Sequence, residues 1–206
     1  MTDNKRIGID LDNTLIDYEE VFRAFARDSG LIAPGFTGGK EDIREVARAT
    51  PDGDIAWQRL QGAVYSRGIR QAVMFDGADA FLRQARDRGF ETVIVSHKTE
   101  FGHFDPDRIN LRRAALEWLD AQGFFRADGF GMSEENVLFA STRSEKITKI
   151  RELGVSFFID DLPEVLEDGD FPAMVTGILF TRGGGTVSAY PRALPHWHDI
   201  AELVFG

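Results

Sequence analysis

The chain has 206 residues, 43% hydrophobic and 28% charged, which is typical of a folded globular protein and excludes a disordered, collagenous or coiled-coil chain. Its formal net charge of −10 argues against nucleic acid or an anionic membrane surface as a partner. Cysteine is absent, so we expect no disulfide framework and no thiolate metal site, and any bound metal has carboxylate or imidazole ligands.

The start of the chain is polar and then strand-like, which is unlike a secretory signal peptide. No apolar run approaches the roughly eighteen residues of a membrane-spanning helix. We therefore expect a cytoplasmic protein that does not enter a membrane.

The first element is a short apolar run, Arg6–Asp10, which predicts a strand. About sixty residues of helical character follow, with no convincing strand before Met74. Helical patterns and short β-branched runs then alternate to the end of the chain. The predicted elements are a helix at Ala78–Arg88, a strand at Glu91–Ser96, a helix at Arg108–Gln122, a strand at Asn136–Ala140, a helix at Ser144–Leu153, strands at Ser156–Asp160 and Val175–Thr181, and a terminal helix at Trp197–Phe205.

This alternation is typical of an α/β domain, in which helices cover both faces of a parallel sheet. We interpret the helical stretch after the first strand as an insert in the α/β core. We therefore predict a three-layer α/β/α core from residues 1–16 and 75–206, with a helical cap domain at residues 17–74.

Polar side chains stand where the predicted strands end. Asp10 and Asp12 close the first strand, Ser96 closes the second, and the pair Asp160 and Asp161 closes the fourth. Ligands of an open parallel sheet bind beyond the carboxyl ends of its strands, so we expect these side chains to converge at one edge.

Carboxylates gathered in this way repel each other, by about 4 kcal/mol for each pair at ~4 Å and an effective dielectric constant near 20. A cation must therefore lie among them. Oxygen ligands without cysteine favour a hard cation such as Mg²⁺. Lys146, in the helix before the fourth strand, supplies a second positive charge.

These residues resemble the haloacid dehalogenase superfamily. Its phosphatase members carry D-x-D-x-T, a strand-terminal Ser or Thr, a Lys and a late acidic pair in this order, here Asp10-Leu11-Asp12-Asn13-Thr14, Ser96, Lys146 and Asp160-Asp161. The resemblance extends from about Lys5 to Phe180 and places the helical insert where type C1 caps occur. It implies a Rossmann-type core and a Mg²⁺-dependent phosphatase.

The resemblance also implies a role for each residue. Asp10 is the nucleophile that forms an aspartyl-phosphate, and Asp12 is the general acid and then the base. Thr14 orients either the loop or Asp12, Ser96 binds a phosphoryl oxygen, and Lys146 stabilises the charge that develops.

For the metal, the resemblance implies ligation by Asp10, by the Asp12 carbonyl, and by the pair Asp160 and Asp161. Which member of the pair touches the metal directly stays open. In relatives the position of Asp161 more often does so.

Asp12 separates two branches of this family. Dehalogenases lack an acid at this position because halide leaves without a proton, whereas the alkoxide of a phosphate ester needs one. Phosphatase chemistry is therefore favoured. Asn13 stands where relatives most often have glycine, and asparagine also accepts left-handed turn geometry.

Three further residues are candidate substrate contacts. His97 and Lys98 follow Ser96 beyond the end of a strand, and Arg143 precedes Lys146 at the start of a helix. They are suited to an anionic group on the substrate. The alternative is that they are ordinary surface residues.

The sequence therefore predicts hydrolysis of a small phosphorylated metabolite, either a sugar phosphate or a nucleoside monophosphate. A phosphotransferase or mutase that uses the same intermediate is the first alternative. A non-catalytic scaffold domain that keeps a Mg²⁺ site is the second.

Overall fold

The computed structural model describes residues 6–105, 107–183 and 189–206. The chain divides into two compact units, which are described separately. The first unit comprises Met1–Ile16, Met74–Lys98 and Leu119–Gly206, and the second comprises Asp17–Val73 and Thr99–Trp118.

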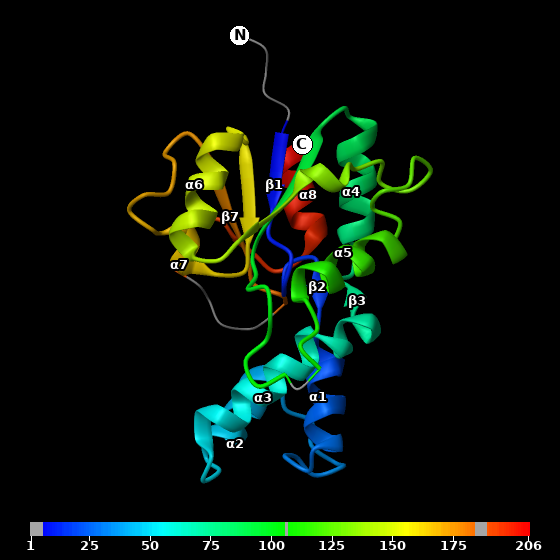
Figure 1. The fold of residues 1–206 in the computed structure, drawn as a ribbon. Helices are drawn as coiled ribbons and strands as arrows, with labels where there is room; N and C mark the ends of the chain where they lie inside the picture. Colours follow the sequence, from blue (N-terminus) through cyan, green and yellow to red (C-terminus); the bar gives the residue numbers. More distant parts are fainter. Residues whose placement is uncertain (1–5, 106, 184–188) are drawn as a thin grey trace. The chain divides into compact units, whose positions relative to one another are not determined.

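The first unit is built on a six-stranded parallel sheet with the order β5-β4-β1-β6-β7-β8 (Figure 1). The strands are β1 (Arg6–Ile9), β4 (Glu91–His97), β5 (Val137–Ala140), β6 (Phe157–Asp160), β7 (Thr176–Phe180) and β8 (Ala193–Leu194). β1 lies between β4 and β6, so the chain segments that follow these three strands leave the same edge of the sheet side by side. The predicted fold class and all five predicted strands are confirmed.

Helices cover both faces of this sheet, which makes three layers (Figure 1). The helices of the first unit are α4 (Ala78–Asp87), α6 (Arg143–Leu153), α7 (Pro163–Leu166) and α8 (Trp197–Phe205), with the single 3₁₀ turn η2 (Glu134–Asn136). On one face, Ile147 and Ile150 of α6 and Phe158 of β6 belong to one buried apolar cluster. On the other face, the ring of Trp197 packs against those of Phe81 and Phe180.

Glycines follow the ends of two helices. The C-cap of α6 is Gly154, with φ of 58°, and Gly89 follows α4 with φ of 76°. Both are left-handed conformations that L side chains avoid. α6 begins at Thr142, whose hydroxyl accepts a hydrogen bond from the Glu145 amide over 3.1 Å.

The second unit is helical. It contains α1 (Glu19–Asp28), α2 (Lys40–Arg48), α3 (Gly53–Tyr65) and the 3₁₀ helix η1 (Arg67–Gln71), and most of α5 (Leu111–Ala121). Two short strands, β2 (Ile16–Asp17) and β3 (Val73–Met74), pair where the chain passes between the units. The ring of Trp57 on α3 stacks on that of Phe22 on α1, so the centre of this unit is aromatic.

The division differs from the predicted one because residues 99–118 group with residues 17–73. Two glycines explain this packing. A Cβ atom at Gly62 on α3 would lie 2.5 Å from the carbonyl oxygen of His103, and one at Gly102 would lie 3.1 Å from the Gly62 Cα. The loop backbone therefore rests directly on α3. The Trp118 indole also donates a hydrogen bond to the Ala72 carbonyl over 2.9 Å.

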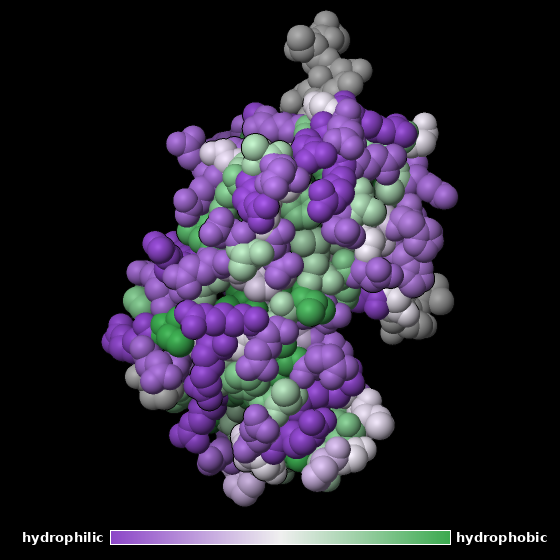
Figure 2. Space-filling model, turned by 90° about the vertical axis from the view of Figure 1, so that its right-hand side faces the viewer, coloured by the Kyte–Doolittle hydropathy of each residue, from purple (hydrophilic) through white to green (hydrophobic). Residues whose placement is uncertain are grey.

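No helix among the described residues is long and apolar enough to cross a membrane. Hydrophilic side chains cover most of the face drawn in Figure 2, in keeping with the high charged fraction.

The centre of the sheet generates a prediction. A Cβ added at Gly8 on β1 would lie 2.5 Å from the Phe158 Cδ2, and that ring is fully buried. We expect Gly8→Ala to lower the free energy of unfolding by about 1–3 kcal/mol in urea denaturation, because the core has no room for the methyl group. Gly169→Ala is the control, since no heavy atom lies within 4 Å of its Cβ. Equal stability of the two variants would contradict this packing.

Candidate active site

The candidate site lies at the carboxyl edge of the sheet, entirely within the first unit. Asp10 follows β1, and its amide donates to the Ile159 carbonyl over 2.8 Å, which ties the segment after β1 to β6. Beyond it the chain turns through Asn13 at φ of 63°, and the Leu15 and Ile16 amides both donate to the Leu11 carbonyl. This tight turn holds Asp12 and Thr14 beside Asp10, as the D-x-D-x-T spacing predicts.

Asp10, Lys146 and Asp160 form a buried ionic cluster. The Lys146 ammonium donates to Asp10 Oδ1 over 2.5 Å and to Asp160 Oδ2 over 2.6 Å. Their side chains are at most 7% exposed. The Thr14 hydroxyl donates to the other Asp10 oxygen over 3.4 Å. Removing Lys146 would leave two buried carboxylates without their partner, so the cluster depends on this lysine.

Negative charge is in excess at this edge. Asp10, Asp160 and Asp161 each place one carboxylate oxygen within 4.8 Å of the others, with one ammonium among them. Burial raises the pKa of Asp10 well above its usual value; Lys146 lowers it, but Asp160 and Asp161 raise it again. For Lys146, burial lowers the pKa, but Asp10 and Asp160 outweigh burial and the pKa ends above its ordinary value. Lys146 therefore keeps its charge.

This donor set fits a hard divalent cation. All three groups offer oxygen atoms, which Mg²⁺ prefers, and a second cation would relieve the repulsion that raises the pKa of Asp10. Asp160 Oδ2 accepts from Lys146, and its Oδ1 accepts from the Leu162 amide over 3.0 Å, so both of its oxygens bind the protein.

Ser96 is the second-last residue of β4, the strand that pairs with β1. Its side chain is 1% exposed, and its hydroxyl oxygen has no hydrogen-bond partner among the described residues. An unpaired buried hydroxyl costs about 1–3 kcal/mol. It is therefore placed to bind an oxygen atom that a ligand brings.

The three candidate substrate contacts lie in different surroundings. His97 is exposed, and its Nε2 lies 3.1 Å from the Ser141 carbonyl after β5. Arg143 is half exposed and reaches toward α7, where it donates to the Glu164 carbonyl over 3.3 Å.

Lys98, in contrast, is 4% exposed and contacts Asp12, with its ammonium 2.8 Å from Oδ2 and 3.0 Å from Oδ1. The sequence interpretation missed this pairing. The only signal was a lysine two positions after a strand-terminal serine.

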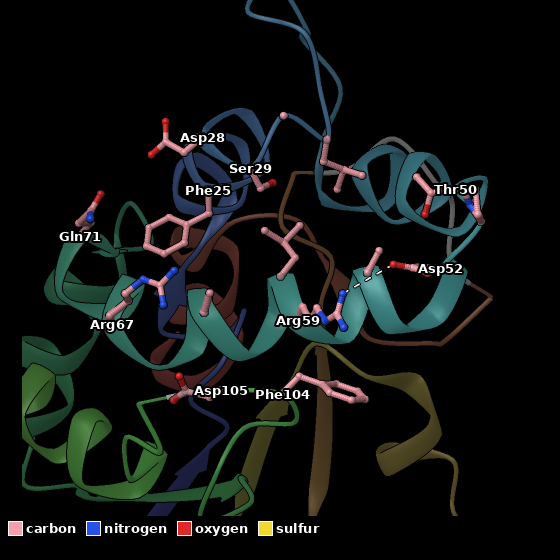
Figure 3. Close-up of a pocket in the computed structure, with 16 residues that line it drawn as sticks. Phe25, Asp28, Ser29, Thr50, Asp52, Arg59, Arg67, Gln71, Phe104 and Asp105 are labelled. Carbon is pink, nitrogen blue, oxygen red and sulfur yellow. Dashed lines mark ion pairs between the residues drawn. The ribbon is translucent and has the colours of Figure 1, made fainter.

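A cavity of about 1100 Å³ lies in the second unit, and none of the predicted site residues lines it. Figure 3 shows Arg59 of α3 and Arg67 of η1 among the residues that line it. Their guanidinium groups lie 5.7 Å from the centre of the Phe104 ring and 5.3 Å from that of the Phe25 ring, respectively.

Known proteins show the same fold. The structure aligns with a haloacid dehalogenase superfamily hydrolase from Ehrlichia chaffeensis (TM-score 0.56, 11% identity, 99% of this chain and 97% of the other). It also aligns with a predicted phosphatase from Clostridium acetobutylicum (TM-score 0.58, 15% identity, 97% of each chain) and with Protein Tyrosine Kinase A of Mycobacterium tuberculosis (TM-score 0.62, 17% identity, all of both chains). No protein-family profile matches the sequence, and no curated protein sequence matches it. The fold is that of the haloacid dehalogenase superfamily, as the motifs predict.

The charge excess makes a prediction for the metal-free protein. A folded-state pKa of Asp10 above its unfolded value means that stability falls as pH rises through the folded-state pKa, so the charge costs stability at neutral pH. We expect Asp10→Asn to raise the free energy of unfolding in EDTA at neutral pH by about 1 kcal/mol, a Tm increase of about 2–4 °C.

The control is Asp87→Asn, which alters an exposed carboxylate paired with Arg86, and we expect it to shift Tm by less than about 1 °C. A fall in the Tm of Asp10→Asn by several degrees would contradict the electrostatic account. It would mean that the bond to Lys146 outweighs the repulsion.

Proposed function

We propose that this chain, whose fold is that of the haloacid dehalogenase superfamily hydrolases, is a Mg²⁺-dependent phosphatase that forms an aspartyl-phosphate on Asp10. The observations that support the proposal are the contact between Asp10 and Lys146 and the unpaired hydroxyl of Ser96 near the carboxyl end of the adjacent strand β4. A carboxylate nucleophile, a cation and a hydroxyl donor together fit a phosphoryl group better than any other small anion.

In the first step, a carboxylate oxygen of Asp10 forms a bond to phosphorus, and the bond from phosphorus to the leaving oxygen breaks. Asp12 gives its proton to that oxygen, so the product leaves as an alcohol. Lys146 and Ser96 stabilise the phosphoryl oxygens as their charge shifts. The tight turn at Asn13 keeps the nucleophile and the acid on the same short loop.

In the second step, Asp12 takes a proton from a water molecule as the water oxygen bonds to phosphorus. The bond between phosphorus and Asp10 breaks, and inorganic phosphate leaves. The atoms and protons balance, because Asp12 ends each cycle with the proton that it lost in the first step.

Asp10, Asp161 and the backbone carbonyl of Asp12 would hold Mg²⁺, with Asp160 as a support. The resemblance to the superfamily implies Asp161 as the direct ligand, and Lys146 and the Leu162 amide hold Asp160 in place beside it. A bound Mg²⁺ supplies charge neutralisation between the carboxylates and the incoming phosphate. Sugar phosphates and nucleoside monophosphates are the substrate classes that we propose, and His97 and Arg143 are exposed residues suited to bind further polar groups on them.

Phosphoryl transfer to an acceptor other than water is the second candidate. The alignment with Protein Tyrosine Kinase A of Mycobacterium tuberculosis, whose name describes a phosphotransferase, favours it. The same intermediate on Asp10 serves both reactions, and they differ in what attacks phosphorus in the second step.

A phosphate-release assay tests the first candidate. We expect turnover of sugar phosphates, nucleoside monophosphates or a generic aryl phosphate with Mg²⁺ and none with EDTA. Asp10→Asn should lower kcat by on the order of 10⁴-fold or more, because the nucleophile is lost. Asp87→Asn should keep its activity.

Substantial activity of Asp10→Asn would exclude Asp10 as the nucleophile. If phosphate is released only when an acceptor alcohol is absent, and phosphorylated acceptor forms when one is present, the protein is a phosphotransferase. No turnover with any substrate or acceptor, despite Mg²⁺ binding, would favour a non-catalytic scaffold domain.

A further inference from the structure

The structure holds two buried lysines at the carboxyl edge of the sheet, and they serve different carboxylates. Lys146 contacts Asp10 and Asp160, whereas Lys98 contacts Asp12. The side chain of Lys98 is 3% exposed and that of Asp12 is 17% exposed. A buried ammonium loses its hydration, and an ion pair with a carboxylate offsets that loss. Asp12 supplies the carboxylate.

The backbone of Lys98 is fixed to the sheet. Its amide donates to the Ala140 carbonyl at the end of β5 over 3.0 Å, so the chain after β4 is fixed to the neighbouring strand. Asp12 is fixed from the other side by the turn at Asn13. Two rigid backbone segments, one after β4 and one after β1, therefore meet through this ion pair.

The ammonium contacts both carboxylate oxygens of Asp12, at 2.8 and 3.0 Å. A contact to both oxygens restricts rotation of the carboxyl group about its terminal bond. Proton transfer depends on orientation, because the acid must lie within hydrogen-bond reach of the leaving oxygen. Misplacement by about 1 Å can cost on the order of 100-fold in rate.

We propose that Lys98 is a positioning residue that orients the carboxyl group of Asp12 for proton transfer to the leaving oxygen. This inference rests on the proposed function and goes beyond it, because Lys98 is then not a contact for the substrate. Lys98 also stabilises the carboxylate that remains on Asp12 after the proton has gone to the leaving oxygen. No proton is lost from Lys98 in either step.

The dependence on the leaving group tests this role. The value of kcat/KM reports the first step, in which the leaving oxygen accepts the proton. A nitrophenolate leaves with little help from an acid, whereas an alkoxide needs the proton. Lys98→Met removes the ammonium and keeps most of the side-chain length, so it should act mainly on substrates that need the acid.

We expect Lys98→Met to lower kcat/KM for an alkyl phosphate by on the order of 100-fold, and for 4-nitrophenyl phosphate by less than about 10-fold. Asp12→Asn should show the same selectivity. The double variant should be no worse than Asp12→Asn alone, because the two residues act as a unit. Lys98→Arg should recover part of the loss. Lys149→Met, which alters a partly exposed ion pair with Glu145 on α6, is the matched control and should keep both activities.

Equal loss on both substrates, or no loss on either, would overturn the role of Lys98 while leaving the phosphatase proposal standing. A wild-type protein that hydrolyses neither of these substrates nor any other phosphate ester would overturn the phosphatase proposal and the role of Lys98 with it. These two failures are distinguished by the wild-type measurement.

Stability supplies a readout that does not need turnover. In EDTA, Lys98→Met should lower Tm by on the order of 5 °C, since Asp12 loses its buried partner. The double variant should lose less than the sum of the single losses. Additive losses would show that the pair is not coupled and would also overturn the proposal.

Discussion

The site depends on one electrostatic constraint: buried carboxylates gather at a sheet edge with fewer positive charges than negative ones. Asp10 and Asp160 share the ammonium of Lys146, and Asp161 places a carboxylate oxygen within 4.8 Å of theirs. Burial and mutual repulsion raise the pKa of Asp10, so the ionised form of this residue lowers the stability of the folded protein. Such a cost is typical of functional sites, where a ligand completes the charge balance.

The parallel sheet creates this arrangement. Because β1 lies between β4 and β6, residues separated by many positions in the sequence leave adjacent strands at the same end. Asp10, Ser96 and Asp160 come from these three strands, and α6 brings Lys146 to the same edge. The strand order therefore matters more to the site than any single contact does.

Most of the core could be predicted from the sequence, because short β-branched runs and glycine-terminated helices have strong local signals. β8 and α7 could not, since two and four residues are too few to show a period. The helix predicted from Arg108 begins at Leu111. Residues 99–118 group with the second unit through packing at Gly62 and Gly102, which is a tertiary effect without a local signal.

Part of the candidate site could likewise be predicted from the sequence, and part could not. The order of the motifs predicted the convergence of Asp10, Lys146 and Asp160, because strand ends and topology decide where those side chains lie. The partner of Lys98 was missed, since a lysine side chain is long enough to reach either a ligand or a neighbouring loop. Only the three-dimensional structure shows that it reaches Asp12.

The central claim is that phosphorus bonds covalently to Asp10 during turnover. Acid quenching of the protein during steady-state hydrolysis, followed by mass spectrometry of its peptides, tests this claim most directly. The account predicts one added phosphoryl group on the peptide that contains Asp10, present with Mg²⁺ and absent with EDTA and in Asp10→Asn. A phosphoryl group found on another residue, or none during active turnover, would contradict it.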